Sequence, residues 1–533
     1  MRKLGGLSGF PKTTESEYDA FNTGHSSTSI SAALGMLRAK RLNGDDGYVV
    51  AVIGDGALTG GMAYEALNAA GDEKENFIVI LNDNEMSISK NVGSLSNYLT
   101  SLRSKPTYFK LKAEIERHFV KIPAIGVPIV KGLKKIKDRF RHLLTPKTIF
   151  ECLGFTYLGP IDGHNIKALT YVLKSAKWIK GPVLVHVVTK KGKGYSLAET
   201  EPTQYHGVSA KFVQKDAPKE NGIKNYSDAF GKKLESLAHD NDKICAITAA
   251  MLEGTGLCEF SKRFPERFFD VAIAEQHAVT FAAGLAMGGY KPVFVVYSSF
   301  LQRAYDQILH DVCLQNLDMV FCIDRAGLVG EDGETHQGLF DIAYMSHMPN
   351  MTVLAPCNFD ELSKMLEYSI NVHKGPVCIR YPRGSTQLLY DNPAPFEPGK
   401  ADVLTKGKDA AILFAGHMGK IAKDVYDLLK AKGIELSLIN LRTLMPIDSS
   451  HLKELLAGTK VAFVLEDGIE RGGVGEYIVS LLKDIDISVS IKAHKEGIVQ
   501  HGKVDELYEI CGFGAEQIAK EIILKLEKKD GQV

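Results

Sequence analysis

The sequence lacks three features that would assign it to other classes of protein. Lys plus Arg and Asp plus Glu number 64 each, so there is no basic excess of the kind that binds nucleic acids or membrane surfaces. No apolar run approaches the ~18 residues that span a bilayer, and the polar, glycine-rich start does not resemble a signal segment. None of the eight cysteines forms a CxxC pair, which favours buried free thiols in a reducing compartment. We therefore expect a soluble, cytoplasmic protein with no nucleic-acid or membrane partner.

The order of apolar and amphipathic stretches predicts the fold class. Residues 48–54 and 77–83 are continuous β-rich runs typical of buried parallel strands, and residues 62–70 between them are predicted to form a helix. Similar strands are predicted at 182–189, 244–250, 292–299, 318–324, 351–356, 376–382, 409–416, 435–442, 461–467 and 488–493. Polar breaks at 213–226 and 391–400 then predict three consecutive α/β domains with mostly parallel sheets, over 1–214, 225–392 and 400–533.

Two stretches are predicted to be structural rather than functional. The cationic segment 90–145 has no strand pattern and is expected to be a solvated helical excursion rather than a nucleic-acid site. The glycine-rich loop 466–475 lacks the G-x-G-x-x-G order of a nucleotide loop, which favours a tight turn with close helix packing.

Polar residues follow the first two predicted strands. Gly54-Asp55-Gly56 ends one strand, and Asn84, 29 residues after Asp55, follows the next. Ligands of such sheets bind outside the carboxyl ends of the strands. The glycines permit a tight turn and close backbone approach, and Asp55 offers the hard oxygen that Mg²⁺ prefers beside phosphates. The alternative is two ordinary strand-to-helix turns.

This spacing resembles the signature of thiamine diphosphate enzymes. The resemblance implies that Asp55, Asn84 and the backbone carbonyl of Met86 bind Mg²⁺, that Ile88 props the cofactor in a bent conformation, and that Tyr195 lies near the diphosphate. The remaining cofactor contacts that it implies are Gly24, His25, Ser26, Gly56, Ala57 and Phe300, with Phe300 stacking on the aminopyrimidine.

Thiamine chemistry also needs a carboxylic acid that hydrogen-bonds N1′ of the aminopyrimidine. Glu275 is expected to end a short apolar strand and to open a helix over 278–286. By itself, a glutamate at a helix N-terminus is equally explained by the helix dipole. The surrounding AIAEQHAV resembles the catalytic glutamate segment of transketolase-like enzymes.

Longer stretches are similar to the 1-deoxy-D-xylulose-5-phosphate synthase family. The resemblance implies a homodimeric enzyme that joins pyruvate to D-glyceraldehyde 3-phosphate, releasing CO₂ and 1-deoxy-D-xylulose 5-phosphate, in the first step of the non-mevalonate isoprenoid pathway. The alternatives are a transketolase, another acyl- or ketol-transferring thiamine enzyme, or an inactive fragment. The matching stretches are 24–35, 52–71, 81–89, 270–286, 300–307, 310–312, 324–338 and 380–384.

The resemblance also implies roles for residues of the acceptor site. Arginines suit the phosphate of the acceptor because their planar fork donates two hydrogen bonds; the alternative for each is a surface ion pair. The substrate-binding residues implied are Tyr297, Arg303, Arg325 and Arg383, and the catalytic residues besides Glu275 are Asp332, His336 and His206. Full-length members of this family carry roughly a hundred residues before the segment matching 5–11, and those include histidines near the cofactor.

Overall fold

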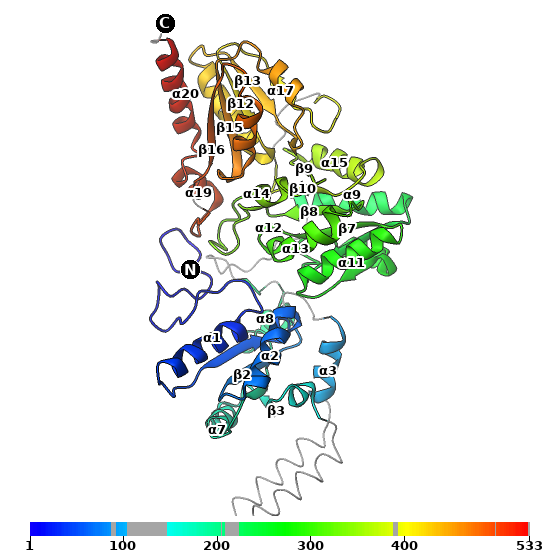
Figure 1. The fold of residues 1–533 in the computed structure, drawn as a ribbon, viewed down its shortest axis with the longest axis vertical. Coiled ribbons are helices and arrows are strands. Elements are labelled where there is room, and N and C mark those ends of the chain that lie inside the picture. Colours follow the sequence, from blue (N-terminus) through cyan, green and yellow to red (C-terminus); the bar gives the residue numbers. More distant parts are fainter. Residues whose placement is uncertain are drawn as a thin grey trace, which may run out of the picture. The chain divides into compact units, whose positions relative to one another are not determined.

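The computed structural model describes residues 1–86, 92–103, 147–203, 205–207, 223–386, 393–495 and 497–530. The chain divides into two compact units, one of residues 26–207 and one that combines residues 1–25 with 208–533. Each unit has its own α/β core, and Figure 1 labels many of the helices and strands of both. Within the described ranges, no helix is long and apolar enough to cross a membrane.

The unit of residues 26–207 is built on a four-stranded parallel sheet with the order β1-β2-β4-β3. The predicted β-α-β unit is confirmed, because a helix joins its first two strands. The sequence pattern does not predict β3, since Gly159 and Pro160 interrupt its apolar run. The elements are β1 (Val50–Gly54), α2 (Gly61–Glu73), β2 (Ile78–Asp83), β3 (Thr156–Asp162) and β4 (Val183–Val188).

Helices pack on both faces of this sheet. Ala51 and Ile53 of β1 point toward the core beneath α1 and α2, so Val50 and Val52 point to the opposite face because strand side chains alternate. On that face α7 packs over β3 and β4, and Val50 and Val52 stay 46% and 59% exposed. The other elements of this unit are α1 (Ser29–Leu42), η1 (Ala57–Thr59), α3 (Ser94–Arg103), α6 (Ile149–Cys152), α7 (Ile166–Ala176) and α8 (Ser196–Thr200).

The second unit contains a seven-stranded sheet with the order β14-β9-β10-β8-β7-β5-β6. All of its pairings are parallel except that of the edge strand β14 with β9. Its strands are β5 (Ile244–Thr248), β6 (Phe268–Asp270), β7 (Lys291–Tyr297), β8 (Val320–Asp324), β9 (Thr352–Leu354), β10 (Val377–Arg380) and β14 (Thr443–Met445). Its helices are α9 (Tyr226–Asp240), α10 (Cys258–Arg263), η2 (Pro265–Arg267), α11 (Glu275–Met287), α12 (Ser298–Leu301), η3 (Gln302–Ala304), α13 (Tyr305–Gln307), η4 (Ile308–Cys313), α14 (Asp341–Ser346) and α15 (Phe359–Asn371).

A five-stranded sheet with the order β11-β13-β12-β15-β16 completes this unit. Helices α16 and α20 pack on one face, and α17 and α18 pack on the other (Figure 1). The three predicted sheets and their mostly parallel order are thus confirmed. The elements are β11 (Asp402–Thr405), β12 (Ala410–Phe414), η5 (Gly416–Met418), α16 (Gly419–Lys430), β13 (Leu436–Asn440), α17 (Ser449–Leu455), β15 (Val461–Ile469), α18 (Val474–Leu481), β16 (Ser488–His494), α19 (Val504–Ile510) and α20 (Ala515–Asp530).

One hydrophobic core cluster contains buried residues of both the five-stranded and the seven-stranded sheet, and β14 links the two sheets directly. This strand follows β13 of the five-stranded sheet in the chain but pairs with β9 of the other sheet. Its three residues form no recognisable apolar run, so the sequence pattern does not predict it. The predicted domain boundaries stay a prediction. Of the predicted excursion at 90–145, only 92–103 lies within the described residues, and it contains α3.

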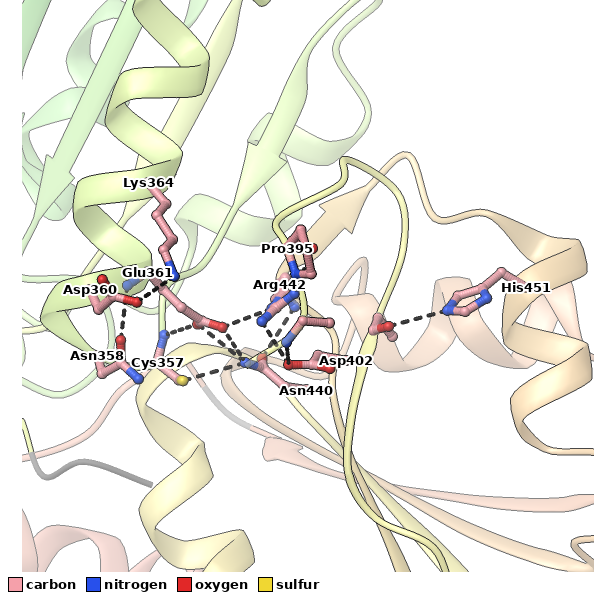
Figure 2. Close-up of polar contacts among 12 residues, drawn as sticks. Cys357, Asn358, Asp360, Glu361, Lys364, Pro395, Asp402, Asn440, Arg442 and His451 are labelled. Carbon is pink, nitrogen blue, oxygen red and sulfur yellow. Dashed lines mark hydrogen bonds and ion pairs between the residues drawn. The ribbon is translucent and has the colours of Figure 1, made fainter. Parts of the chain in front are cut away.

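A buried polar network fixes the connection that leads into β14 (Figure 2). Arg442 Nε donates to Glu361 Oε1 of α15 at 2.8 Å, and Arg442 Nη2 donates to Asp402 Oδ2 of β11 at 2.7 Å. Asn440 Nδ2 donates to both oxygens of Glu361, at 3.0 and 3.2 Å. Each of these four side chains is less than a tenth exposed. A buried cation between two carboxylates therefore ties both sheets together.

Replacing Arg442 by leucine is expected to leave two buried carboxylates without their counter-charge. Breaking a buried ion pair in this way costs about 3–5 kcal/mol, so the thermal midpoint of this unit should fall by several degrees. Arg263→Leu is a matched control, because the Arg263–Glu235 pair is largely exposed on its arginine side and exposed pairs contribute about 0–1 kcal/mol. Equal midpoints for the two variants, measured by thermal unfolding, would contradict the importance of the network.

Candidate active site

Asp55 and Asn84 lie at the same edge of the four-stranded sheet. Gly54 pairs with Asn82, and the backbone N–H of Asp55 donates to the carbonyl of Asn82 at 3.2 Å. Asn84 Oδ1 accepts a hydrogen bond from the backbone N–H of Met86 at 3.0 Å, with Glu85 between them at φ +64°. One tight turn therefore carries the Asn84 side chain and the Met86 carbonyl.

The carboxyl group of Asp55 is buried and incompletely satisfied. It is 4% exposed, and its Oδ1 has no hydrogen-bond partner among the described residues. Burial, followed by the negative charge of Asp83, raises the pKa of Asp55 to about 7. A bound divalent cation would supply the missing partner and offset both effects. No group of three or more His, Cys, Asp or Glu forms a metal site in the described ranges, so the candidate set is carboxylate, amide and carbonyl oxygen, which suits Mg²⁺.

A chain of hydrogen bonds that joins Asp83, His186 and Tyr157 lies next to Asp55, and the sequence pattern does not predict it. Asp83 Oδ2 accepts a hydrogen bond from His186 Nε2 at 2.9 Å, and Tyr157 donates its hydroxyl proton to His186 Nδ1 at 2.7 Å. All three side chains are buried. Burial by itself would raise the pKa of Asp83, but the bond from His186 and the charge of Arg103 outweigh it and lower that pKa. Asp83 therefore stays ionised, and Asp55 is the carboxyl of this pair that holds a proton.

The two glycines around Asp55 do not supply the conformational freedom expected of them. Neither has a positive φ, and Gly56 is right-handed helical at φ −64°, ψ −45°, a conformation open to any residue. Asp55 and Gly56 do form the predicted turn, but it does not require glycine, and close approach of this backbone to a ligand stays a prediction. The positive φ in this region belongs to Ser27, at +74°, and its hydroxyl donates to the carbonyl of Ala57 at 2.7 Å. This bond fixes the Ser26–Ser27 turn to the loop that follows Asp55.

Lys191 adds a cation near this site that the sequence pattern does not single out. Burial lowers its pKa, and the negative charge of Asp55 partly opposes that effect. Its Nζ donates to His206 Nδ1 at 3.0 Å, so the exposed His206 is oriented by this lysine. Tyr195 precedes α8 and contacts the ring of Tyr205 edge-on at 5.5 Å. Ile88 lies outside the described residues.

Glu275 belongs to the other unit and is the first residue of α11. The prediction that Glu275 ends a strand is wrong, because β6 stops at Asp270 and residues 271–274 lie between that strand and the helix. The Glu275 side chain is 3% exposed. Burial raises its pKa, while Arg303, whose Nη1 lies 3.8 Å from Glu275 Oε2, opposes the rise. The predicted acceptor-site residue Arg303 is therefore the charged neighbour of the predicted catalytic acid.

Aromatic rings gather beside the 324–338 loop in the same unit. The Phe300 ring makes edge contacts with His25 at 4.9 Å and His336 at 5.3 Å, measured between centroids. Tyr297 ends β7, and its ring supports the guanidinium of Arg325, whose Cζ lies 3.5 Å from the ring centroid. The structure therefore brings three predicted residues, His25, His336 and Arg325, together around Phe300 and Tyr297.

Arg325 and Arg383 form a pair of cations with different surroundings. Burial, followed by the charge of Arg383, lowers the pKa of Arg325 to about 9, and Arg325 Nη1 has no partner in the described part of the chain. Arg383 is about half exposed and lies 3.5 Å from Asp332 Oδ2 through its Nη1. Two adjacent cations, one with an unused buried donor, are suited to an anionic ligand such as a phosphate.

His336 and Asp332 contact residues that the sequence pattern does not predict for this site. Arg2 forms an ion pair with Asp332, and Phe10 stacks on His336. Burial lowers the pKa of His336 to about 4, even though the charge of Asp332 opposes the shift. Burial would raise the pKa of Asp332, but His336, Arg2 and Arg383 together lower it. The imidazole is therefore neutral and the carboxylate ionised near neutral pH.

Gly24 and His25 approach this loop closely. A Cβ atom on Gly24 would lie 2.2 Å from Thr335 Oγ1, so only glycine fits there. His25 Nε2 donates to the backbone carbonyl of Thr335 at 2.5 Å, and burial lowers the pKa of His25. Arg2 and Phe10 lie in the same N-terminal segment, and their approach to this loop depends on contacts distant in the chain, which explains why sequence reasoning gives them no role in the site.

Comparison with known proteins shows which families the chain resembles. The family description "1-deoxy-D-xylulose-5-phosphate synthase" matches residues 1–189, "Transketolase, pyrimidine binding domain" matches 224–387, and "Transketolase, C-terminal domain" matches 399–518. The 1-deoxy-D-xylulose-5-phosphate synthase of Clostridium tetani is 51% identical over 526 residues, which covers 98% of this chain and 85% of that protein. The synthase of Caldanaerobacter subterraneus subsp. tengcongensis is 49% identical, covering 100% of this chain and 86% of its own length.

Solved structures of transketolases have a fold similar to that of this chain. A split-gene transketolase, described as an inactive beta4 tetramer, is 29% identical with a TM-score of 0.52 and covers 57% of this chain and 99% of its own. The transketolase of Campylobacter jejuni, at 18% identity and TM-score 0.50 over 94% of this chain and 82% of its own, shows the shared fold. Fold and matches together define a transketolase-like, thiamine diphosphate-dependent transferase. Within that class, the chain belongs to the 1-deoxy-D-xylulose-5-phosphate synthase family.

Proposed function

We propose that this chain condenses pyruvate with D-glyceraldehyde 3-phosphate to give 1-deoxy-D-xylulose 5-phosphate and CO₂. The observation that carries the proposal is the buried carboxyl group of Glu275, because burial raises its pKa. The chain is also about half identical to synthases of this product. Bound thiamine diphosphate supplies the nucleophilic carbon and the electron sink that decarboxylation of a 2-oxo acid requires. Glu275 can hold a proton toward the aminopyrimidine ring, since its burial favours the protonated form.

The other predicted residues take complementary roles in this proposal. Asp55, Asn84 and the Met86 carbonyl would hold Mg²⁺, and Lys191 adds a positive charge for a diphosphate. Arg325 and Arg383 would bind the phosphate of the acceptor, because both present guanidinium donors on one loop cluster. Neutral His336 can accept or donate a proton, and ionised Asp332 keeps Arg2 and Arg383 in place.

Product analysis separates this function from that of a transketolase. The purified chain is supplied with thiamine diphosphate and Mg²⁺ and offered either pyruvate with D-glyceraldehyde 3-phosphate or a ketose phosphate with an aldose phosphate. We expect deoxyxylulose phosphate from the first pair and little ketol transfer from the second. Ketol transfer without deoxyxylulose phosphate would replace the proposal by the transketolase alternative.

Mg²⁺ binding is expected to release a proton from Asp55 at mildly acidic pH. With a pKa of about 7, this carboxyl is protonated below pH 7, so a cation must displace that proton and binds more weakly there. Calorimetric titration of Mg²⁺ in buffers of different ionisation enthalpy should show about one proton released near pH 6 and almost none near pH 8.5. The same proton release at both pH values would show that Asp55 does not bind the ion.

We also propose that the chain works as a homodimer in the cytoplasm, which the family resemblance suggests. Light scattering on the purified protein should give twice the mass of one chain. A mass equal to one chain at micromolar concentration would reject the dimer.

A further inference from the structure

Phe10 lies against a predicted catalytic residue, although the sequence analysis assigns it no role in the site. Its ring stacks on the His336 imidazole with centroids 4.9 Å apart and planes 12° apart. The segment that carries Phe10, residues 1–25, is part of the same compact unit as the 324–338 loop. This is therefore a face-to-face contact within one unit, between the N-terminal segment and the loop that holds His336.

Phe10 is also one member of a closed ring of contacts. The Arg2 guanidinium carbon lies 5.5 Å from the Phe10 centroid, and Arg2 forms an ion pair with Asp332. Asp332 in turn acts electrostatically on His336. A planar apolar ring thus contacts both the cation and the imidazole, and the Asp332 carboxylate interacts with both as well. Such an arrangement restrains the imidazole more than a single contact would.

The remaining sides of the His336 ring are held by the same unit. Thr335 Oγ1 is hydrogen-bonded to His336 Nδ1 at 2.8 Å, and Phe300 contacts the ring edge-on. In the described part of the chain, Nε2 of His336 has no hydrogen-bond partner. Nε2 is therefore the nitrogen that can exchange a proton with a ligand, and Phe10 covers one face of the ring that carries it.

The surroundings of His336 explain why covering its imidazole with the Phe10 ring should change a measurable quantity, the pKa of His336. Arg2, Arg325 and His25 disfavour a charged imidazole, and Asp332 favours one. Burial is the largest of these influences and lowers the pKa of His336. Removing the Phe10 ring would let water reach one face of the imidazole and would weaken that influence.

We propose that Phe10 is a positioning residue for His336, whose ring it holds in one orientation by covering one of its faces. The inference rests on the proposed function for its catalytic consequence, but the state of the His336 ring can be measured without turnover. Phe10 is not itself placed in contact with substrate. An ordinary packing role would give stability without any effect on the imidazole.

Three variants and one control test this role. Phe10→Leu and Phe10→Ile keep an apolar side chain but remove the planar ring, whereas Phe10→Tyr keeps it. Phe21→Leu is the matched control, because Phe21 lies in the same N-terminal segment and is 51% exposed. Circular dichroism checks that each variant is folded, and the two aliphatic variants guard against failure of either one to fold.

The first readout is NMR titration of ¹³C-histidine-labelled protein, with the His336 signal assigned by its loss in His336→Asn. In Phe10→Leu we expect the pKa of His336 to rise by about one unit, and in Phe10→Tyr and Phe21→Leu to stay unchanged. An unchanged pKa in both aliphatic variants would overturn the proposal. This readout stands even if the chain makes no deoxyxylulose phosphate, a result that would reject only the proposed function.

The second readout is the rate of deoxyxylulose phosphate formation against pH. Phe10→Leu should lower kcat about tenfold with little change in the KM for pyruvate, and the acid limb of its profile should move with the His336 titration. Phe10→Tyr should restore kcat to within about twofold of the parent. An equal loss of kcat in Phe10→Tyr, or the same loss in Phe21→Leu, would also overturn the proposal.

Discussion

Glu275→Gln is expected to lower kcat by about 10²–10⁴-fold, the range that removal of an acid–base group costs. Glutamine keeps the shape of the side chain but cannot hold a transferable proton. The fold should not suffer, because burial raises the pKa of Glu275 and an ionised carboxylate is therefore unfavourable at this position. Removing the charge should leave the thermal midpoint at neutral pH equal or slightly higher.

The matched control for Glu275→Gln is Glu259→Gln. Glu259 is also in the first turn of a helix, α10, but its side chain is 70% exposed and pairs with the equally exposed Lys262. The same chemical change should leave kcat unaltered there. If Glu275→Gln kept its activity to within about threefold of the parent, Glu275 would be only a helix N-terminal residue, as the dipole alternative holds.

Asp55→Asn is expected to weaken binding of thiamine diphosphate with Mg²⁺ by about 100-fold or more. The amide retains an oxygen but loses the negative charge, and even the outer partners of a metal site alter affinity by about 10–100-fold. The fold of the unit should persist, because the neutral amide resembles the protonated carboxyl that a pKa of about 7 favours at mildly acidic pH. Isothermal calorimetry with Mg²⁺ and thiamine diphosphate measures the loss.

Asp72→Asn controls for the loss of one negative charge in the same unit. Asp72 is exposed on α2, away from the carboxyl ends of the strands, so its replacement should not change affinity. Unaltered binding in Asp55→Asn would mean that the turns after β1 and β2 are ordinary strand-to-helix connections. Equal losses in both variants would point to a general charge effect instead.

The architecture could be predicted from continuous apolar runs, and the exceptions have physical causes. Buried parallel strands such as β8 are apolar throughout and stand out in the sequence. β3 contains Gly159 and Pro160, which normally mark turns, and β14 is only three residues long. Its pairing with β9 depends on a buried network around Arg442 whose partners are distant in the chain, which no local pattern reveals.

In the candidate site, too, some residues could be predicted from the sequence and others could not. Residues such as Asp55 and Glu275 could be selected because they lie in recognisable local sequences. Asp83, His186 and Tyr157 could not, since their chain of hydrogen bonds exists only when three neighbouring strands are paired. Arg2 and Phe10 are likewise selected only by contacts with a loop more than 300 residues away. Burial, together with long-range contacts of this kind, sets the protonation of Asp55 and His336, which sequence reasoning alone cannot assign.

Carbon-13 NMR of the reaction product tests the central claim most directly. The chain, loaded with Mg²⁺ and thiamine diphosphate, is incubated with [2,3-¹³C₂]pyruvate and unlabelled D-glyceraldehyde 3-phosphate. The proposed function predicts that both labels stay bonded to each other and appear as the methyl and carbonyl carbons of 1-deoxy-D-xylulose 5-phosphate. Folded, cofactor-saturated protein that leaves pyruvate unchanged, or converts it only to products without the triose carbons, would contradict the assignment.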